Sequence, residues 1–296
     1  MPKTVLITGA ATGIGNLTAR ALATAGHTVF ASMRGPGKSN AGHARELLDT
    51  AEKDGVDLRV VELDVQSQDS CDAAVRTVLD ATGQLDVVIH NAGHLYVGYT
   101  EAFTAEDVNH LFDINATGVQ RLNRSALPHM RERGDGVLLY VGSTIPISTP
   151  PFLGPYVASK AAMDALAVVT SYEVGQFGIE TVIVMPGAFT KGTEHFPDAS
   201  HASDEARGKE YAKLDHLVAR NEEATASLLD DGDDGNPVVV ATEITRILGL
   251  PKGEKPYRSV VDLTHADVER ANAVNQEVRE NFVRRMGFEQ LLTVTQ

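Results

Sequence analysis

The chain has 296 residues, 43% hydrophobic and 22% charged, a composition that excludes a fibre or a disordered protein. Its formal net charge of −14 argues against a general binder of nucleic acid or of anionic membranes. The single cysteine, Cys71, excludes an internal disulfide framework, and we expect it to be inert packing. The length fits one large α/β domain or two small ones.

Targeting and membrane segments are not expected. The first apolar run is interrupted at once by Thr8 and Gly9, so it does not read as a signal peptide. No apolar run approaches the ~20 residues that a membrane helix needs. Together with the lone thiol, which suits a reducing compartment, these features predict a soluble, cytoplasmic protein.

The chain opens with a strand, a glycine turn and a helix. Residues 4–7 are apolar and β-branched, Gly9, Gly13 and Gly15 follow, and residues 16–25 read as a helix closed by Gly26. A helix start presents unpaired N–H groups and the positive end of a dipole, so this order is the setting of a phosphate site. Glycines allow a pyrophosphate to approach the backbone, although a tight loop without a ligand has the same pattern.

Strand-like and helix-like segments then alternate along the chain. The apolar runs lie at 4–8, 28–32, 58–65, 85–93, 136–143 and 180–187, with a further candidate at 257–263. Helical patterns between them include residues 69–81, 104–129 and 156–176. Strands that are apolar on both faces and alternate with helices predict a Rossmann-type, doubly wound parallel sheet with helices on both faces. With no internal repeat or linker, residues 1–296 are expected to form a single domain.

The character of the chain changes after Gly187. Residues 192–236 are rich in Asp, Glu, His and Ala, and we expect residues 190–236 to form a lid or insertion on the substrate side, with a variable surface insertion as an equal alternative. Asn236 is expected to cap a helix with Pro237 at its first position, and a last helix is expected over 264–285. The acidic run 230–234 lacks calcium-loop spacing, and the ten histidines are scattered, so no metal is implied.

A second motif lies in the stretch "YVASK" at 156–160. In a helix, Tyr156 and Lys160 are four residues apart and project from one face. A neighbouring ammonium favours the phenolate and lowers the pKa of a tyrosine, so the pair could pass a proton near pH 7. Alone, such a pair is usually an accident of helix composition.

Taken together, these motifs resemble the short-chain dehydrogenase/reductase family in its single-domain branch, over roughly residues 1–190. The resemblance rests on the order and spacing of Thr8-Gly9-x3-Gly13-Ile14-Gly15, Asn91-Ala92-Gly93, Asn115, Ser143 and Tyr156-x3-Lys160. The glycine spacing differs from the G-x-G-x-x-G of other dinucleotide folds and from the G-x-x-G-x-x-G of the family's longer branch. The resemblance implies hydride transfer between a nicotinamide and a secondary alcohol or its carbonyl compound.

The resemblance also implies roles for four catalytic residues. Tyr156 is the general acid in carbonyl reduction, and Lys160 lowers its pKa and holds the cofactor ribose. Ser143 hydrogen-bonds the substrate oxygen, unless it merely satisfies a turn at a strand end. Asn115 holds a water that connects Lys160 to solvent.

The cofactor is expected to contact residues from six stretches of the chain. Asp64 and Val65 flank the adenine, and Asn91 to Gly93 approach it closely through the backbone. Lys191 stands where the family often has the threonine that binds the nicotinamide amide, so Thr190 and Thr193 both remain candidates. The full expected set is Gly9, Thr12, Gly13, Ile14, Gly15, Arg34, Asp64, Val65, Asn91, Ala92, Gly93, Tyr156, Lys160, Pro186, Gly187, Phe189 and Thr190.

The second strand predicts NADP(H) over NAD(H). No carboxylate occurs between Arg20 and Glu46, and Ser32 is taken as the position where an NAD-preferring member carries its acid. Arg34 is expected to bind the 2′-phosphate with Lys38 as a helper, although it lies one step later than in the commonest pattern. Thr12 stands where many NADP-users have a basic residue, and Arg34 capping a sheet edge is the alternative.

The substrate is expected to be a hydrophobic ketone or aldehyde. Two alternatives are a redox-sensing regulator that binds NADP(H) without turnover, and a dehydratase or epimerase on the same scaffold. The family is usually dimeric or tetrameric, so we expect a homodimer or homotetramer through the helices near Thr104 and Tyr156. The substrate pocket is expected to be lined by Leu95, Tyr96, Ile145, Pro146, Phe152, Leu153, Phe189 and Phe196. The contact between subunits is expected to involve Ala158, Ala161, Ala162 and Ala165, although these alanines could equally face the sheet.

Overall fold

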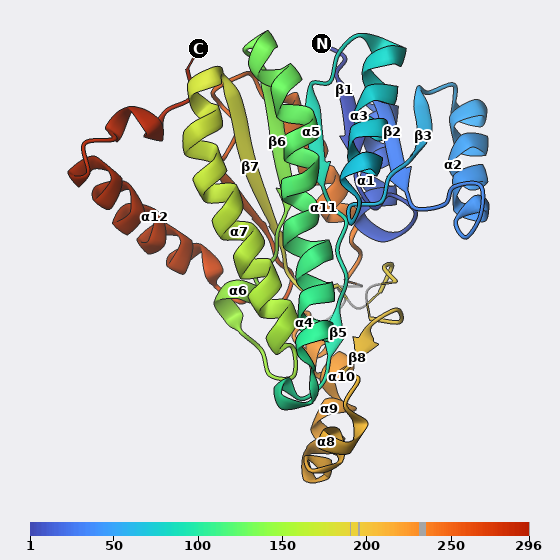
Figure 1. Cartoon of the computed structure of the whole chain (residues 1–296), viewed down its shortest axis with the longest axis vertical. Helices are drawn as coiled ribbons and strands as arrows, with labels where there is room; N and C mark the ends of the chain where they lie inside the picture. Colours follow the sequence, from blue (N-terminus) through green and yellow to red (C-terminus); the bar gives the residue numbers. More distant parts are fainter. Residues whose placement is uncertain (190, 195, 231–234, 296) are drawn as a thin grey trace.

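A seven-stranded, fully parallel sheet forms the centre of the computed structural model, which describes residues 1–189, 191–194, 196–230 and 235–295. The strand order is β3-β2-β1-β4-β6-β7-β9, so the order reverses between β1 and β4 (Figure 1). Every strand predicted from the apolar runs is present, and the doubly wound fold is confirmed. The strands are β1 (Thr4–Ile7), β2 (Thr28–Met33), β3 (Leu58–Glu62), β4 (Val87–His90), β6 (Gly136–Val141), β7 (Ile179–Pro186) and β9 (Arg258–Val261).

Helices cover both faces of this sheet because alternate strand residues point to opposite sides. On β1, Val5 and Ile7 join the core under α1 (Gly13–Thr24), α2 (Ala41–Asp54) and α11 (Val238–Gly249). Leu6 joins the core on the other face, under α3 (Gln68–Thr82), α5 (Gly118–Arg133) and α7 (Gly154–Val174). Within the described ranges, no helix combines the length and the apolar character that spanning a bilayer requires.

Cys71, a residue of α3, is fully buried in the core. Burial raises the pKa of its thiol to about 11, so the reactive thiolate is disfavoured at neutral pH.

Several helix boundaries differ from the sequence prediction, among them the following three. The helix expected over 104–129 is divided into α4 (Ala105–Phe112), a π-helical turn (Asp113–Thr117) and α5. The first helix begins at Gly13 rather than at residue 16, since the glycine turn itself enters the helix. The last helix, α12 (Val268–Arg285), begins four residues later than expected, because the Asp262 carboxylate accepts hydrogen bonds from the backbone N–H groups of Thr264 and Ala266 and holds a turn there.

The described residues between 191 and 236 extend from the carboxyl end of the sheet and carry the short helices α8 (Glu205–Lys209), α9 (Asp215–Val218) and α10 (Asn221–Ala226) (Figure 1). This segment is tied to the body where β8 (Ser200–His201) pairs with β5 (Tyr96–Val97). Ion pairing of Arg207 with Glu101 at 2.7 Å adds a second tie. The segment therefore lies over the sheet end where ligands bind in doubly wound folds.

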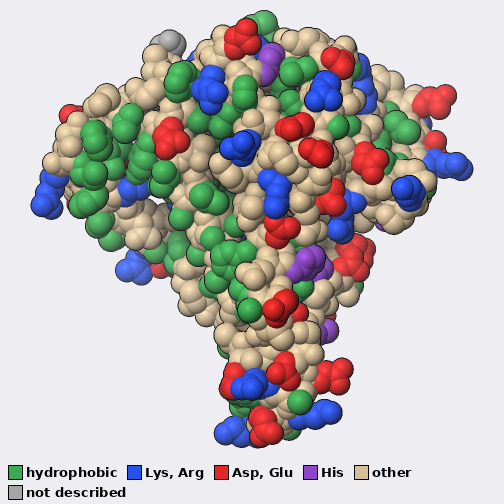
Figure 2. Space-filling model, viewed as in Figure 1, with side chains coloured by type: hydrophobic (Ala, Val, Ile, Leu, Met, Phe, Trp, Pro, Cys, Tyr) green, Lys and Arg blue, Asp and Glu red, His purple; other side chains and the backbone are tan. Residues whose placement is uncertain are grey.

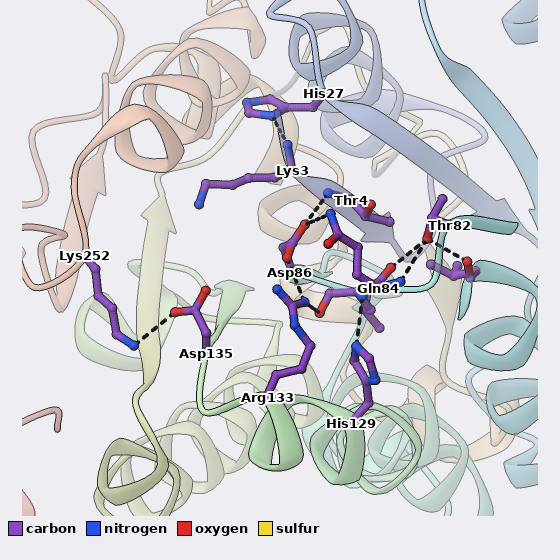
Figure 3. Close-up of polar contacts among 12 residues, drawn as sticks. Lys3, Thr4, His27, Thr82, Gln84, Asp86, His129, Arg133, Asp135 and Lys252 are labelled. Atoms are coloured by element: carbon purple, nitrogen blue, oxygen red, sulfur yellow. Dashed lines mark hydrogen bonds and ion pairs between the residues drawn. The ribbon is translucent and has the colours of Figure 1, made fainter. Parts of the chain in front are cut away.

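The opposite end of the sheet is closed by a polar network around Asp86 (Figure 3). The Asp86 carboxylate accepts hydrogen bonds from the backbone N–H of Thr4 at 2.7 Å, from Gln84 Nε2 at 3.2 Å and from Arg133 Nη1 at 2.8 Å. At the same end, an exposed pair joins Lys252 to Asp135. Asp86 thus fixes the amino ends of β1 and β4 far from the cavity described next.

Candidate active site

A cavity of about 780 Å³ opens at the carboxyl ends of the strands. Its walls come from the turn after β1, from the ends of β2, β3, β4, β6 and β7, and from the segment after residue 190. It lies at the reversal of strand order, where the loops on either side diverge and leave a crevice.

The glycine turn and the Asn91-Ala92-Gly93 stretch are packed against each other. Asn91 Nδ2 donates to the backbone oxygens of Thr8 and Gly9, both at 2.9 Å. A Cβ on Gly9, whose φ is +64°, would lie only 2.8 Å from Ala92 Cα, and one on Gly15 would collide with Asn91. Close internal packing therefore requires both glycines.

The start of α1 remains open to the cavity. Gly9, Thr12, Gly13 and Ile14 line it, whereas Gly15 lies behind them. The unpaired N–H groups at this helix start suit a phosphate group, so the turn fits a dinucleotide.

Tyr156, Lys160 and Ser143 line one region of this cavity. The first two project from α7, and Ser143 follows β6. Ser143 Oγ accepts a hydrogen bond from Ile145 N at 3.2 Å, and Lys160 Nζ donates to the Val141 carbonyl at 3.1 Å. The structure therefore brings the three side chains to the same cavity.

Burial controls the ionisation of the Tyr156–Lys160 pair. Tyr156 is 6% exposed and Lys160 7% exposed. Burial lowers the pKa of Lys160 to about 8 and raises the pKa of Tyr156 above its usual value. Burial of the phenol thus dominates the pKa of Tyr156 in this state of the protein, and the expectation that Lys160 lowers this pKa remains a prediction.

Asn115 lies in the π-helical turn and is buried beside Lys160 rather than in the cavity wall. Its Oδ1 accepts from His94 N at 2.8 Å, and its Nδ2 donates to His94 O at 3.0 Å and to Ser159 Oγ at 3.0 Å. The carboxamide is thus occupied in holding the His94 peptide, and the expectation that Asn115 holds a water remains a prediction.

The sequence prediction that Ser32 occupies the place of an NAD-selecting acid, at the end of β2, is wrong. Ser32 is fully buried, and its hydroxyl donates to the Ile7 carbonyl at 2.8 Å. Met33 and Arg34 line the cavity instead, together with Asn40, whose Nδ2 donates to the Arg34 carbonyl at 2.7 Å. Lys38 is exposed and is not among the lining residues.

The remaining predicted cofactor residues lie in the cavity wall with one exception. The lining set includes Asp64, Val65, Asn91, Ala92, Gly93, Pro186, Gly187 and Phe189. Thr190 falls outside the described residues. Thr193 lines the cavity and lies against the glycine turn, with its Cβ 3.5 Å from where a Cβ on Gly13 would stand.

Of the apolar residues expected around the substrate, Leu95, Ile145, Leu153, Phe189 and Phe196 line the cavity. Tyr96 packs against Phe103, Phe152 contacts Tyr99 edge to face, and Pro146 faces a different cavity, so these three predictions are wrong.

Sequence reasoning missed several polar lining residues. His94 directly follows Gly93, and its place in the chain could have revealed it. No local pattern marked the others, which the tertiary fold brings in from distant segments: Glu194, Asp198, Asn221, Thr225, Thr264 and His265. In the part of the chain that the structure describes, no group of His, Cys, Asp and Glu side chains is arranged to hold a metal ion.

Comparisons with known proteins agree with this fold. Residues 3–203 match the family model described as short chain dehydrogenase. A short-chain dehydrogenase of Streptomyces avermitilis superposes with a TM-score of 0.74 at 26% identity over 97% of both chains. The chain belongs to the short-chain dehydrogenase/reductase family, a family of oxidoreductases.

Two curated relatives carry more specific names. A 3-ketodihydrosphingosine reductase of Bacteroides thetaiotaomicron is 32% identical over 191 residues, 64% of this chain and 65% of the relative. An NADPH-dependent pterin aldehyde reductase of Arabidopsis thaliana is 30% identical over 186 residues, 62% of this chain and 74% of the relative. The match thus spans slightly less than two thirds of the first relative's length.

Proposed function

We propose that the protein is an NADP(H)-dependent oxidoreductase that interconverts a hydrophobic ketone or aldehyde and its alcohol. The observation that carries the proposal is a single cavity lined by Ser143, Tyr156 and Lys160 and also by the glycine turn and Arg34. A hydride donor held along the turn would therefore share one enclosed space with a proton donor.

The chain's own groups would manage the proton and the developing charge. When bound, the nicotinamide would supply the hydride to the carbonyl carbon, or accept it in the reverse direction. In reduction, Tyr156 Oη gives its proton to the carbonyl oxygen while Ser143 Oγ donates a hydrogen bond to the same oxygen. Lys160, with a pKa near 8, retains a proton at neutral pH that it can release to the tyrosinate.

Preference for NADP(H) is supported by the charge at the end of β2. Arg34 is exposed and lines the cavity, and it would pair with a 2′-phosphate. The neighbouring lining residue is Met33, so no carboxylate at this strand end would accept a hydrogen bond from a free 2′-hydroxyl. The Arabidopsis relative is named as NADPH-dependent, which agrees with this choice.

The apolar walls support a hydrophobic substrate. Ile145, Leu153 and Phe196 line the cavity together with Tyr156 and Ser143. Residues 190–236 act as the lid in this proposal, because Phe196 and Leu228 of that segment close the same space. The relative named 3-ketodihydrosphingosine reductase is compatible with a cavity of this kind.

We also propose that the protein is a cytoplasmic homodimer or homotetramer. Ala158, Ala161 and Ala165 are exposed on α7, where another helix could approach closely, whereas Ala162 packs toward the sheet. Leu166 and Val169 are exposed on the same helix. The single buried thiol suits a reducing compartment.

The test is steady-state oxidation of NADPH and of NADH, followed by absorbance, against a panel of hydrophobic ketones and aldehydes. Turnover that prefers NADPH supports the proposal. Preference for NADH contradicts the cofactor assignment alone. Tight NADPH binding without oxidation by any panel member favours a sensor, and loss of water from a hydroxylated substrate without net redox change favours a dehydratase.

A further inference from the structure

A second cavity, of about 280 Å³, lies between α7, α12 and the short helix α6 (Ile145–Ser148). Helix α12 diverges from α7 in Figure 1, and α6 lies near the base of both. The two cavities share α6 as a wall, since Ile145 and Ser148 line the catalytic cavity whereas Pro146 and Ile147 line the second. The second cavity is separate from every residue of the proposed reaction.

The polar part of this wall is made mostly of hydrogen-bond donors. It contains two guanidinium groups, one carboxylate and three carboxamides, namely Arg258, Arg279, Asp164, Asn272, Asn275 and Gln276. Arg258 is fully engaged by Asp164, with Nη1 and Nη2 donating to the two carboxylate oxygens at 2.6 and 2.7 Å. The charge of Arg258 is therefore balanced within the protein.

Arg279 has no such partner. Its guanidinium lies over the Tyr257 ring at 4.7 Å, and Nη1 makes a long hydrogen bond of 3.4 Å to Tyr257 Oη. Its Nε is buried without a hydrogen-bond partner, and no carboxylate of a described residue forms an ion pair with it. The adjacent Glu280 is turned to Arg284 and Gln276, at 2.9 and 2.7 Å.

Arg279 therefore has N–H groups available to donate hydrogen bonds to a ligand. A buried guanidinium N–H without a partner is costly, and the planar fork of an arginine matches the oxygens of a carboxylate or phosphate. Asn272 donates only to the sulfur of Met185 at 3.3 Å, a weak acceptor that an anionic oxygen could replace. Opposite these donors, Ile147 and Val168 offer an apolar surface.

We propose that this cavity binds a small oxyanion, a carboxylate or phosphate group on a molecule of metabolite size, with Arg279 as its charged contact. The volume is at the lower limit of small-molecule sites, which start near ~300 Å³, so a nucleotide does not fit. The carboxamides of Asn272 and Asn275 supply further donors, and Ile147 and Val168 contact the remainder of the ligand. The proposal does not depend on the reaction proposed above.

Isothermal titration of the full-length protein with inorganic phosphate, and separately with succinate, tests the site at constant ionic strength. The wild type should bind at least one of them saturably with a Kd below about 10 mM. Arg279→Gln should weaken that binding about tenfold or more, because hydrogen bonds to a charged group are among the strongest in proteins. Arg270→Gln is the matched control, since Arg270 lies on the same helix with its side chain 84% exposed and should leave the Kd unchanged.

Further variants separate this site from the catalytic cavity. If Arg279→Gln does not fold by circular dichroism, Arg279→Lys retains the charge, loses the fork and should also weaken binding. Absence of saturable binding by the wild type overturns the proposal, as does equal affinity in the wild type and both Arg279 variants. Loss of binding in Arg34→Gln, with Arg279→Gln unaffected, places the anion in the catalytic cavity and also overturns it. Preference for phosphate or for succinate identifies the kind of oxyanion.

Discussion

Lys160 places a cationic side chain in a nearly dry site, and this has a consequence for stability. Its folded pKa is about 8, against an ordinary value of 10.5. Between these values the unfolded chain binds the proton and the folded chain does not, so this group destabilises the fold below pH 8 and the penalty disappears as pH rises to 10.5. Catalytic placement of the lysine therefore opposes stability at neutral pH.

We predict that the stability of the wild type relative to Lys160→Met rises by about 2 kcal/mol between pH 7 and pH 10, because a pKa difference of one between the folded and unfolded chains is worth ~1.4 kcal/mol. Urea unfolding of both proteins at the two pH values measures it. Because all other titratable groups are present in both proteins, their contributions cancel when the free energy of unfolding of the variant is subtracted from that of the wild type. A difference that stays constant with pH would show that the lysine is not desolvated.

At the other end of the cavity, Arg34 should decide between the two cofactors. Arg34→Gln is predicted to weaken NADPH binding by about tenfold or more and to leave NADH binding nearly unchanged, because only the former loses a charge-assisted hydrogen bond. Fluorescence titration with each cofactor measures this. Lys38→Gln, whose parent side chain does not line the cavity, is the control and should change neither affinity by more than about twofold. Equal losses for both cofactors would refute the assignment of Arg34 to the phosphate.

Single residues also show where sequence patterns stop being informative. Tyr156 and Lys160 were predicted to share a face because they lie four apart in a helix, and Ser143 was predicted from the resemblance to the family. All three line the same cavity. The sequence prediction that Ser32 faces the cofactor was wrong, because its side chain is buried against the Ile7 carbonyl. One step along a strand reverses the side to which a residue points, and a sequence motif does not fix that step. The two hydrogen bonds between the Asn115 carboxamide and the His94 backbone join residues 21 apart in the chain, and no local sequence pattern predicts them.

At the scale of elements, the network around Asp86 separates stability from activity. Asp86→Ala is predicted to lower the free energy of unfolding by about 2–3 kcal/mol, because the Thr4 N–H and the Arg133 guanidinium lose their acceptor. Denaturant unfolding measures the loss. Turnover below the melting temperature should be unchanged, since this network is at the amino ends of the strands.

Asp135→Ala provides the control for that prediction. Asp135 is 52% exposed and pairs with Lys252 at 3.0 Å, whereas Asp86 is 12% exposed. An exposed pair contributes at most about 1 kcal/mol. Equal effects of the two substitutions would mean that burial of the Asp86 network does not set its strength.

The strands were predictable as elements and the helix boundaries less so. Each strand is a short apolar run bounded by turn residues, a signal that is typical of buried parallel strands. The π-helical turn (Asp113–Thr117) keeps helical dihedrals, so composition shows no break between α4 and α5. The delayed start of α12 depends on the side chain of Asp262, which replaces the helical pattern with a capped turn.

At the scale of the whole molecule, exposed hydrophobic side chains gather on one side. Figure 2 shows them over the region of α12, where Val274, Val278 and Phe282 form a stripe at four-residue spacing. With Val169 on α7, they make a surface suited to a second copy of the chain. From the sequence, a contact between copies was expected on α7 through its alanines, with packing against the sheet as the alternative, and this contact remains a prediction. The apolar stripe on α12 became recognisable only once that helix was placed.

We predict that Val169→Lys shifts the protein toward smaller species in sedimentation velocity, because a buried, unpaired ammonium disfavours association. The control is Val238→Lys, which places the same charge at an exposed position on α11, on the other face of the sheet. An oligomer that survives Val169→Lys intact, or a monomeric wild type, would contradict an interface on α7.

The central claim is that one cavity unites a bound nicotinamide with Tyr156 as the proton donor. The measurement that tests it most directly is single-turnover oxidation of bound NADPH by a carbonyl substrate in the wild type and in Tyr156→Phe, after titration shows that both proteins bind NADPH equally. The account predicts rapid oxidation by the wild type and a rate at least about a hundredfold lower in the variant. Equal rates in the two proteins would contradict it.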